Sequence, residues 1–537
     1  MKTVADQVVG ILKEAGIKVL FGIPSIHNLG LYEALRKEPA IKHILCRHES
    51  TATHMADGYA RESRMVGVVI TSTGPGAGYA VPALQEALGS SAPLLVISTN
   101  IASDKIGKGF GSLHEITGQE EIFQKITKGV FAVRAKSDVE DLTLRALNTS
   151  NTGRPGPVYL EIPTDLLNLE ADEKIRPVRD HSLRPEPLPN LEKAIALIRE
   201  AQSPLILVGT AALRAGLSQE VVALAEALTA PVLFTPNARG MIPDDHPLAL
   251  GNGARRGVIR EAVVSSDLAL AVGTRLREVD AKRRGLLLHR LIHVDWDDQW
   301  IGKNFPTEIA LTGDLLQIVR ALVKKIPPLP HVEKRKARLE DMVSNRHEEI
   351  SQIRKRHREL AYLEALRDVM PRVSTLVVDN TQLGYWSEYF YPSYVPGGWM
   401  GAKGSSIIGF AFAAAVGAKI AAPEKPIVAL IGDGGFLYST QELATCLRHG
   451  IGFPLIVVNS RSYGIIGYLQ KEFHHHEYET RLKNPDFVQL AGAYGVGGCR
   501  VTSPAQLQDA LTEALSSGEM RLIELVEDFP EPPFAKY

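Results

Sequence analysis

The sequence predicts an α/β protein made of three consecutive domains, each with a mainly parallel sheet flanked by helices. Strand-like apolar runs alternate with helix-like periods from one end to the other, which is the pattern of βαβ units. The chain has 537 residues, too many for one hydrophobic core. Proline-rich breaks at 172–190 and 327–330 separate three sections of similar size. We therefore place the domains at 1–171, 190–326 and 355–537.

The first section opens with a helix whose start is marked by Thr3 and Asp6, a pair that can cap the free amides of a first helical turn. This helix should end at Gly16, because glycine commonly follows the last helical residue. β-rich runs follow, and a Gly-Pro-Gly turn at 74–76 lies between two of them. Strands are expected at 18–21, 65–71 and 93–98.

The second section continues this alternation, and a highly charged stretch at 333–359 after it predicts a solvated helix. In the third section a glycine-rich turn at 432–435 follows an apolar run. Ser439 and Glu442 should cap the next helix, which should end at Gly450. Strands are expected at 205–208, 231–235, 268–272 and 291–294 in the second section, and at 375–379, 426–431 and 454–459 in the third.

Composition and charge exclude several classes of function. Sixty basic and 61 acidic residues give a net charge of −1, which provides no electrostatic footprint for nucleic acid or an anionic membrane. The N-terminus has charges throughout and does not resemble a signal peptide. The most apolar stretch, 406–422, is short for a membrane span and should be a buried helix. Three widely spaced cysteines show neither a disulfide framework nor metal-ligand spacing, which favours the cytoplasm.

The turn Gly432-Asp433-Gly434-Gly435 has the chemistry of a phosphate and metal site. It follows a buried strand, and open α/β sheets bind ligands at that end. Glycines let the backbone approach a phosphate closely, and Asp433 can hold Mg²⁺, which takes one or two protein oxygens and the rest from phosphate and water. A lone Gly-Asp-Gly is most often just a turn. Here a βαβ unit follows and ends in Asn459-Ser460, and that combination is far more specific.

The segment from Gly432 to Ser460 resembles the diphosphate- and metal-binding motif of thiamine-diphosphate enzymes. The resemblance covers essentially the whole chain and is closest in the acetolactate synthase and 2-oxo acid decarboxylase branch. It implies that Asp433, the side chain of Ser460 and the backbone carbonyl of Ser462 hold Mg²⁺. Ser460 departs from the family's usual Asn or Asp, and its shorter side chain should weaken metal retention.

The stretch CRHESTATHMADGYAR resembles the family's segment around its catalytic glutamate, and this carries over to Glu49. Without the resemblance, a structural salt bridge would be the simple reading of this glutamate. A carboxyl group in a dry site has a raised pKa and can share its proton with a ring nitrogen of the cofactor's aminopyrimidine. We therefore expect Glu49 to activate the cofactor.

Further cofactor contacts follow from the same resemblance. Ile408 matches the bulky residue over which the family bends its cofactor, although alone it would be plain core. The carbonyl of Ser406 should lie near the aminopyrimidine amine, and Gln382 should line the diphosphate pocket. Gly74 and Gly76 match the family's Gly-Pro-Gly loop, where Gly78-Tyr79 replaces the Thr-Asn common in acetolactate synthases. The family places its cofactor between the first domain of one subunit and the last of another, so a homodimer or homotetramer is implied.

The resemblance assigns the three domains to pyrimidine binding, to a nucleotide-binding-like fold and to diphosphate binding, in that order. Acetolactate synthases hold FAD in the central domain. The loop 252–256 diverges from the flavin-contacting loop, so FAD is not expected here, although the resemblance leaves it open.

Several positions bear on the choice of reaction. Ile26 stands where pyruvate decarboxylases carry an acidic residue, which favours an apolar substrate side chain. His114 lies in the histidine region of those enzymes and is a catalytic candidate; the competing reading is a surface or core histidine. The run His474–His476 is read as solvated, because three consecutive histidines cannot share one helix face.

The leading hypothesis is a thiamine-diphosphate- and Mg²⁺-dependent non-oxidative decarboxylase of a 2-oxo acid, with carboligation left open as a second activity. The first alternative is an acetolactate synthase that condenses two pyruvates. The run GDGGFLYSTQEL supports that alternative, whereas the missing Thr-Asn and the unusual central loop oppose it. A non-catalytic relative that binds the cofactor is a further alternative, favoured by Ser460. A flavin or nicotinamide oxidoreductase lacks a convincing G-x-G-x-x-G motif.

Overall fold

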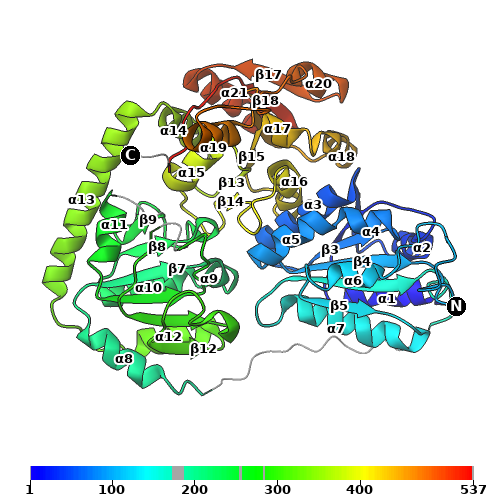
Figure 1. The fold of residues 1–537 in the computed structure, drawn as a ribbon, viewed down its shortest axis with the longest axis horizontal. Coiled ribbons are helices and arrows are strands. Elements are labelled where there is room, and N and C mark those ends of the chain that lie inside the picture. Colours follow the sequence, from blue (N-terminus) through cyan, green and yellow to red (C-terminus); the bar gives the residue numbers. More distant parts are fainter. Residues whose placement is uncertain (1, 172–186, 253–256, 282–284, 535–537) are drawn as a thin grey trace.

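The computed structural model describes residues 2–171, 187–252, 257–281 and 285–534. They form three sheets of six strands, and every strand runs parallel to its neighbours in the sheet. Figure 1 shows three separate sheets flanked by helices, one after another along the chain. This arrangement confirms the predicted fold class. The sheets define an N-terminal, a central and a C-terminal unit.

The N-terminal unit has the strand order β2-β1-β3-β4-β6-β5. The predicted capping box is present: the Asp6 amide donates to Thr3 Oγ1, and the Thr3 amide donates to Asp6 Oδ2. The strands are β1 (Val19–Gly22), β2 (Lys42–Leu45), β3 (Gly67–Thr71), β4 (Leu94–Asn100), β5 (Gly129–Ala132) and β6 (Pro157–Pro163). The helices are α1 (Val4–Glu14), α2 (Leu29–Lys37), α3 (Glu49–Ser63), α4 (Pro75–Tyr79), α5 (Val81–Ser90), α6 (Gln119–Phe123) and α7 (Val139–Asn151).

The central unit has the order β12-β11-β10-β7-β8-β9. The predicted proline-rich break before it lies mostly outside the described residues. The strands are β7 (Pro204–Val208), β8 (Val232–Phe234), β9 (Ala249–Gly251), β10 (Leu268–Val272), β11 (Leu291–Asp295) and β12 (Ile309–Thr312). The helices are α8 (Leu191–Glu200), α9 (Thr210–Arg214), α10 (Ser218–Leu228), α11 (Gly257–Val264) and α12 (Leu315–Lys325).

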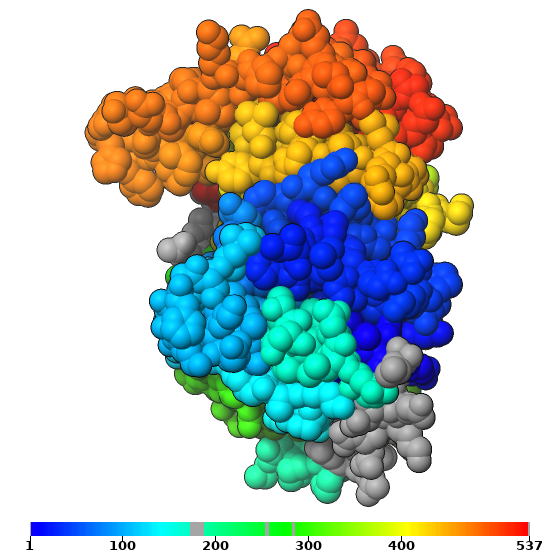
Figure 2. All heavy atoms as spheres, turned by 90° about the vertical axis from the view of Figure 1, so that its right-hand side faces the viewer, coloured from blue at the N-terminus to red at the C-terminus, as the bar shows by residue number. Residues whose placement is uncertain are grey.

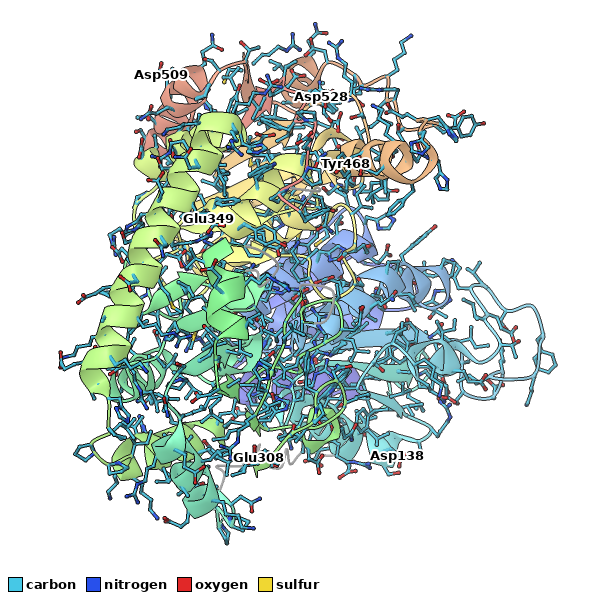
Figure 3. All side chains as sticks on the ribbon, turned by 60° about the vertical axis from the view of Figure 1, so that its left-hand side comes forward. Asp138, Glu308, Glu349, Tyr468, Asp509 and Asp528 are labelled. Atoms are coloured by element: carbon cyan, nitrogen blue, oxygen red, sulfur yellow. The ribbon has the colours of Figure 1, made fainter. Side chains whose placement is uncertain are left out.

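The predicted solvated helix is α13 (Val332–Arg356), which follows the central unit. Only Arg335, Leu339 and Met342 of its residues are buried. Figures 1 and 3 show α13 along the outer edge of the molecule, with Glu349 in its second half, running from the central to the C-terminal unit.

The C-terminal unit has the order β14-β13-β15-β16-β18-β17. Figure 2 shows this unit above the N-terminal unit, with an orange part around residue 470 projecting beyond it. The strands are β13 (Thr375–Val378), β14 (Trp399–Gly401), β15 (Ile427–Gly432), β16 (Pro454–Val458), β17 (Gly497–Val501) and β18 (Arg521–Leu525). The helices are α14 (Glu359–Val369), α15 (Gln382–Phe390), α16 (Phe410–Ala421), α17 (Asp433–Phe436), α18 (Leu443–His449), α19 (Gly464–His474), α20 (Phe487–Ala493) and α21 (Pro504–Ser517).

Helices α3 and α16 hold the N-terminal and C-terminal units together (Figure 1), and their buried residues belong to one apolar core. A Cβ added at Gly58 would lie 2.0 Å from the Ala414 carbonyl oxygen. One added at Gly417 would lie 1.8 Å from the Met55 carbonyl oxygen. Glycine is therefore needed on both helices for the backbones to approach this closely.

One predicted cap is wrong. Ser439 precedes the short 3₁₀ turn Thr440–Glu442, but its buried hydroxyl makes no hydrogen bond. The Glu442 carboxylate accepts instead from the amide of Arg47 in the N-terminal unit and from the hydroxyls of Thr51 and Thr445. Glu442 is fully buried between the two units, so tertiary partners replace the local cap.

Within the described ranges, none of the helices combines the length and the apolarity needed to cross a bilayer.

Candidate functional site

Glu49 lies at the first position of α3, just beyond the end of β2. Its side chain is partly buried, and this burial raises the pKa of the carboxyl group above its ordinary value. A Cβ at Gly76 would lie 3.1 Å from Glu49 Oε1, so the Gly-Pro-Gly turn passes directly over the carboxylate. The protonated form of this acid is therefore more favoured here than it would be in water.

The same turn places His114. Gly74 has φ +62°, and a Cβ there would lie 2.2 Å from the His114 carbonyl oxygen, so only glycine fits. The His114 ring lies 4.8 Å from the His27 ring, centroid to centroid. The Nδ1 atoms of both histidines are buried and have no hydrogen-bond partner. Burial and the nearby His114 lower the pKa of His27.

His27 was missed at the sequence level. It lies next to Ile26, whose side chain is 66% exposed. Spacing gives no sign that positions 27 and 114 meet, because they lie on loops after different strands. The two rings have unpaired Nδ1 atoms, and His114 contacts the same 74–76 turn that passes over Glu49. Imidazoles of this kind can transfer protons.

The C-terminal part of the site begins where β15 ends. The turn continues into α17, and it is tightly enclosed: a Cβ at Gly434 would lie 2.5 Å from the Tyr463 ring, and one at Gly435 would lie 2.7 Å from Asp379 Oδ2. Ile408 borders the same turn, since the Cβ position at Gly435 is 3.5 Å from Ile408 Cγ1. The glycines therefore keep a narrow space open beside Ile408.

Asp433 is buried, and burial raises the pKa of its carboxyl group. Its carboxylate oxygens accept hydrogen bonds from the backbone amide of Gly434 (2.9 Å) and from Asn484 Nδ2 (2.8 Å). The backbone of Arg461 and Ser462 lies near this carboxylate as well and acts to lower its pKa. The end of β15 and the loop after β16 thus meet at one carboxylate.

Ser460 and Ser462 lie together in that loop. The Ser460 hydroxyl is 3.2 Å from the Ser462 carbonyl oxygen and 3.2 Å from the Ser462 hydroxyl. Asn459 points elsewhere and donates to Glu524 Oε1 over 2.6 Å. Asn484, also missed at the sequence level, donates to Asn459 Oδ1 as well as to Asp433. Its role depends on a loop some fifty positions after Asp433, which local spacing cannot reveal.

Three oxygen-containing groups are available here as metal ligands: the Asp433 carboxylate, the Ser460 hydroxyl and the Ser462 carbonyl. Such hard oxygen atoms suit Mg²⁺, whose remaining ligands come from phosphate and water. Among the described residues there is no group of three or more His, Cys, Asp or Glu that could hold a metal ion. The residues present thus fit a magnesium ion that shares its coordination with a phosphate ligand.

Gln382 gives an independent sign of a polar ligand. Its side chain is buried, and neither its amide oxygen nor its amide nitrogen has a hydrogen-bond partner. It borders the loop after β16, because a Cβ at Gly464 would lie 3.2 Å from Gln382 Cγ. A buried amide with both polar atoms unpaired is costly unless a ligand satisfies it. A diphosphate in the adjacent turn fits this need.

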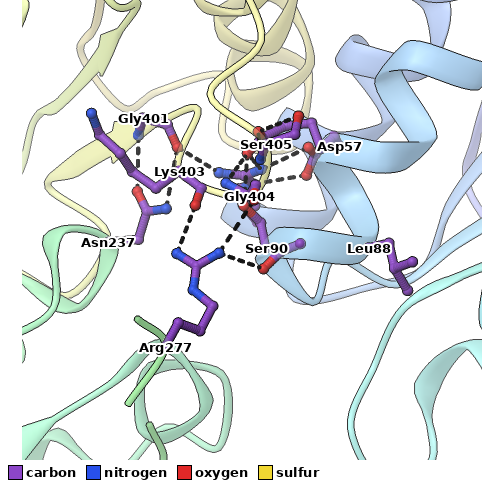
Figure 4. Close-up of polar contacts among 12 residues, drawn as sticks. Asp57, Leu88, Ser90, Asn237, Arg277, Gly401, Lys403, Gly404 and Ser405 are labelled. Atoms are coloured by element: carbon purple, nitrogen blue, oxygen red, sulfur yellow. Dashed lines mark hydrogen bonds and ion pairs between the residues drawn. The ribbon is translucent and has the colours of Figure 1, made fainter. Parts of the chain in front are cut away.

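The segment 401–405 of the C-terminal unit leads from β14 to Ser406, whose φ is +60°, and both other units hold it (Figure 4). The buried Glu86 carboxylate accepts from the amides of Gly404 (2.8 Å) and Ser405 (2.7 Å). From the central unit, Arg277 donates to the Lys403 and Gly404 carbonyl oxygens. These contacts fix the approach to Ser406 and Ile408.

Arg61 adds the contact from α3. It pairs with Asp57 at 2.7 Å and with Glu86 at 3.2 Å, and it donates to the Gly401 carbonyl oxygen. One buried guanidinium therefore pairs with two buried carboxylates and binds the segment at the same time.

A separate cavity lies at the carboxyl edge of the central sheet. Its walls include Arg154, Arg275, Arg277 and Asp295. Burial lowers the pKa of Arg275 to about 9 and raises the pKa of Asp295 to about 6. The prediction that FAD is absent rests on the loop 252–256. Residues 253–256 of this loop lie outside the described residues, so it stays a prediction.

The sequence-predicted site residues thus form two groups on different units. Glu49, Gly74, Gly76 and His114 lie together on the N-terminal unit. A second group lies on the C-terminal unit and contains Gln382, Ile408, Gly432, Asp433, Gly434, Gly435, Ser460 and Ser462, with Ser406 at the end of the segment that approaches it. Within the described part of the chain, no hydrogen bond or ion pair joins the first group to the second.

Comparison with known proteins gives matches in all three units. The models of the thiamine pyrophosphate enzyme domains match residues 2–125 (N-terminal TPP binding domain), 191–322 (central domain) and 379–525 (C-terminal TPP binding domain).

Three relatives are similar over nearly the full length. The chain is 31% identical to a probable acetolactate synthase large subunit of Methanocaldococcus jannaschii, over 98% of this chain and 92% of the relative. It is 34% identical to a probable 2-ketoarginine decarboxylase of Pseudomonas aeruginosa, over 96% of this chain and 92% of the relative. It is 29% identical to the acetolactate synthase isozyme 3 large subunit of Escherichia coli, over 95% of this chain and 92% of the relative.

Proposed function

Because the chain belongs to the thiamine pyrophosphate enzyme family, we propose that it is a Mg²⁺-dependent, non-oxidative decarboxylase of a 2-oxo acid. That it is a thiamine-diphosphate-dependent enzyme of the acetolactate synthase and decarboxylase branch follows from the matches themselves. In the proposal, 1–171 binds the pyrimidine ring, 355–537 binds the diphosphate, and 190–326 is a nucleotide-binding-like domain without FAD.

The cofactor would be held by residues of both groups. The backbone of the 432–435 turn and the free amide of Gln382 would bind the diphosphate. Asp433, Ser460 and the Ser462 carbonyl would hold Mg²⁺. Thiamine diphosphate supplies the nucleophilic carbon and the electron sink of the reaction. Glu49 would keep a proton on its carboxyl group and share it with the pyrimidine ring, because its partly dry environment favours the protonated form.

The pair of His27 and His114 carries the decarboxylase proposal. A non-oxidative decarboxylase must place a proton on the carbon that loses CO₂, whereas a synthase must admit a second 2-oxo acid to that carbon. Two imidazoles with unpaired Nδ1 atoms, 4.8 Å apart and next to the turn over Glu49, supply such a proton donor. The exposed side chain of Ile26 on the same loop favours a substrate with an apolar side chain.

Acetolactate synthase remains the second candidate, because two of the relatives described above carry that name. The test is CO₂ release and product analysis with a panel of 2-oxo acids, thiamine diphosphate and Mg²⁺. An aldehyde formed in equal amount to CO₂ supports the decarboxylase. Acetolactate formed from pyruvate supports the synthase and overturns the proposal. No turnover with any 2-oxo acid supports a cofactor-binding relative without catalysis.

Replacement of His27 by phenylalanine keeps a ring against His114 but removes the proton donor. We expect decarboxylation to fall by about 10²-fold, the usual contribution of one general acid, with unchanged cofactor affinity. In the wild type, burial lowers the pKa of His27, so the part of the activity that needs its proton should fall as pH rises, with a midpoint below 6.5. A pH profile of turnover measures this limb, which should be lost in the variant. His347→Phe, at an exposed position of α13, is the control; an unchanged profile in His27→Phe contradicts the assignment.

Ser460→Asn should tighten Mg²⁺ binding. The asparagine side chain reaches further than serine and offers a carbonyl oxygen, a ligand that Mg²⁺ prefers. We expect affinity to rise by about tenfold, the lower end of the effects seen when groups around a metal are altered. The Mg²⁺ dependence of thiamine diphosphate binding, measured by calorimetry, reports the change, with the exposed Ser344→Asn as control. Equal Mg²⁺ affinity in Ser460→Asn and wild type would show that the side chain at position 460 is not a Mg²⁺ ligand.

We propose further that the protein is a homodimer or homotetramer whose active sites form between subunits. The two groups of site residues share no hydrogen bond or ion pair in the described part of one chain. Large apolar side chains are exposed on both units: Phe110 (67%) and Leu113 (61%) on the N-terminal unit, Phe473 (73%) and Tyr478 (68%) on the C-terminal unit. Such side chains mark surfaces that a partner covers.

Mixing two inactive variants tests this arrangement. After subunit exchange, Glu49→Gln and Asp433→Ala chains would form hybrids in which one site carries both defects and the other carries none. We therefore expect activity to reappear in the mixture, together with a light-scattering mass of two or four chains. A mixture that stays inactive although hybrids form would place both groups in a single chain's site.

A further inference from the structure

A cavity of about 310 Å³ lies where the three units meet. Its walls come from the end of α3, from α9 in the central unit and from the approach to β14 in the C-terminal unit. It shares only Ser90, Thr210 and Asn237 with the cavity at the central sheet's edge. None of the predicted cofactor, catalytic or metal residues lines it. The cavity is therefore a separate feature that the proposed reaction does not use.

Charged side chains of the cavity fall into two classes. Arg61 is paired with the carboxylates of both Asp57 and Glu86, and Glu62 is paired with Lys425 at 2.7 Å. Arg64 and Arg214 are different, because within the described residues neither guanidinium makes a hydrogen bond or an ion pair.

Arg214 lies deeper than Arg64. Its Nε atom is buried without a hydrogen-bond partner. Burial and the nearby Arg61 lower the pKa of Arg214 to about 9, while the nearby Asp57 carboxylate acts in the opposite direction. Arg64 is exposed at the rim, where its Nη1 would lie 3.0 Å from a Cβ at Gly216 of the central unit. Within the described residues the guanidiniums of Arg214 and Arg64 therefore have no ion-pair partner of their own, although the Asp57 carboxylate, which pairs with Arg61, lies near Arg214.

We propose that this cavity binds a small phosphate monoester, with Arg214 inside and Arg64 at the rim as its ligands. Two guanidiniums without an ion pair, one inside the cavity and one at its rim, can bind a phosphate ester from two sides, and the planar fork of arginine suits its oxygens. The volume exceeds what a bare phosphate fills, and Leu213, Trp399 and Met400 supply apolar wall for an organic group. A phosphate ester offers three acceptor oxygens to the two guanidiniums, whereas a carboxylate offers only two.

The test uses the full-length protein saturated with thiamine diphosphate and Mg²⁺, so that the proposed diphosphate site is already occupied. Inorganic phosphate and phenyl phosphate are titrated by isothermal calorimetry, with acetate at equal ionic strength as a carboxylate control. We expect one saturable site per chain, tighter binding of phenyl phosphate than of phosphate, and no saturable heat with acetate. Absence of saturable binding of both phosphates overturns the proposal, and equally tight binding of acetate overturns the choice of a phosphate.

Variants locate the site. Arg214→Met keeps the length of the side chain and removes its charge, and Arg64→Gln removes the charge at the rim. Each should weaken phenyl phosphate binding at least tenfold, whereas Arg199→Gln, at an exposed position of α8, should leave it unchanged. Wild-type affinity in both Arg64→Gln and Arg214→Met would assign the heat to another place on the protein. Because decarboxylation is not the readout, failure of this proposal and failure of the proposed function can be told apart.

Discussion

Glu49→Gln is expected to remove most of the turnover while the fold stays intact. Glutamine has the same shape and can keep the neighbouring contacts over the Gly76 turn, but it cannot hold and share an acidic proton. General acid–base groups contribute about 10²–10⁴-fold to a rate, and we expect a loss in this range in kcat. The measurement is CO₂ release with the best substrate of the 2-oxo acid panel. Glu14→Gln, at an exposed position of α1, is the matched control.

The stability of the same variant gives a second readout with a defined sign. Burial raises the pKa of Glu49 in the folded protein above its unfolded value. The stability that this group contributes is therefore present below the unfolded pKa and is lost as pH rises through the folded pKa. Gln cannot ionise, so Glu49→Gln should be at least as stable as wild type at neutral pH, and the advantage should shrink as pH falls. Thermal unfolding at several pH values measures it.

An outcome in which Glu49→Gln loses activity and also unfolds at lower temperature would mean that the carboxylate is a structural ion-pair partner. Full activity in Glu49→Gln would end the assignment of the proton to this residue. Only lost turnover combined with retained stability agrees with the proposed role, because a catalytic group is commonly held at some cost to stability.

The fold class was predictable because a buried parallel strand leaves a local mark. β10 and β16 are continuous apolar runs bounded by turn residues, and such runs need no knowledge of the rest of the chain. The ends of α1 and α18 were predictable for a similar reason. The Thr3–Asp6 cap lies within one helical turn, and Gly450 adopts the left-handed conformation that ends α18.

Features that depend on tertiary contacts were not predictable in this way. Ser439 and Glu442 have the spacing of a cap, yet Glu442 turns to the N-terminal unit, whose backbone and hydroxyl groups offer better partners. His27 meets His114 only because Gly74 admits the His114 backbone to the turn. Glu86 lies in the middle of α5 and gives no sign in the sequence that it binds the segment leading to Ser406.

The site follows the same division. The order Gly-Asp-Gly-Gly after a strand indicated the turn that Asp433 occupies, because the motif and the strand are adjacent in sequence. Two further residues lie at this turn: Gln382, whose amide is free, comes from α15, and Asn484 comes from the loop before α20. Their contribution depends on how the strands are ordered in the C-terminal sheet, and strand order is not written in any local pattern.

Gly417→Ala in α16 is the second substitution with a large expected effect. In an ordinary helix interior, replacing glycine by alanine stabilises by roughly 1 kcal/mol. Here the new methyl group would lie 1.8 Å from the Met55 carbonyl oxygen of α3, which no rotamer can avoid. The two helices must move apart, and overpacking of this kind costs about 1–3 kcal/mol or more. We therefore expect a net loss of stability, opposite in sign to the intrinsic helix preference.

The displacement should also reach the chemistry, because α3 begins with Glu49 and α16 follows directly after Ile408. Gly492→Ala in α20 is the matched control: it is also a helical glycine, but its Cβ would meet no atom within 4 Å. Urea unfolding should show Gly417→Ala less stable and Gly492→Ala as stable as wild type or more so, while turnover falls only in Gly417→Ala. Equal stabilisation by both alanines would mean that α3 and α16 do not approach this closely. Some other contact would then have to fix the position of the N-terminal group of site residues relative to the C-terminal group. In the present structure α3 and α16 connect the unit that carries Glu49 to the unit that carries the 432–435 turn.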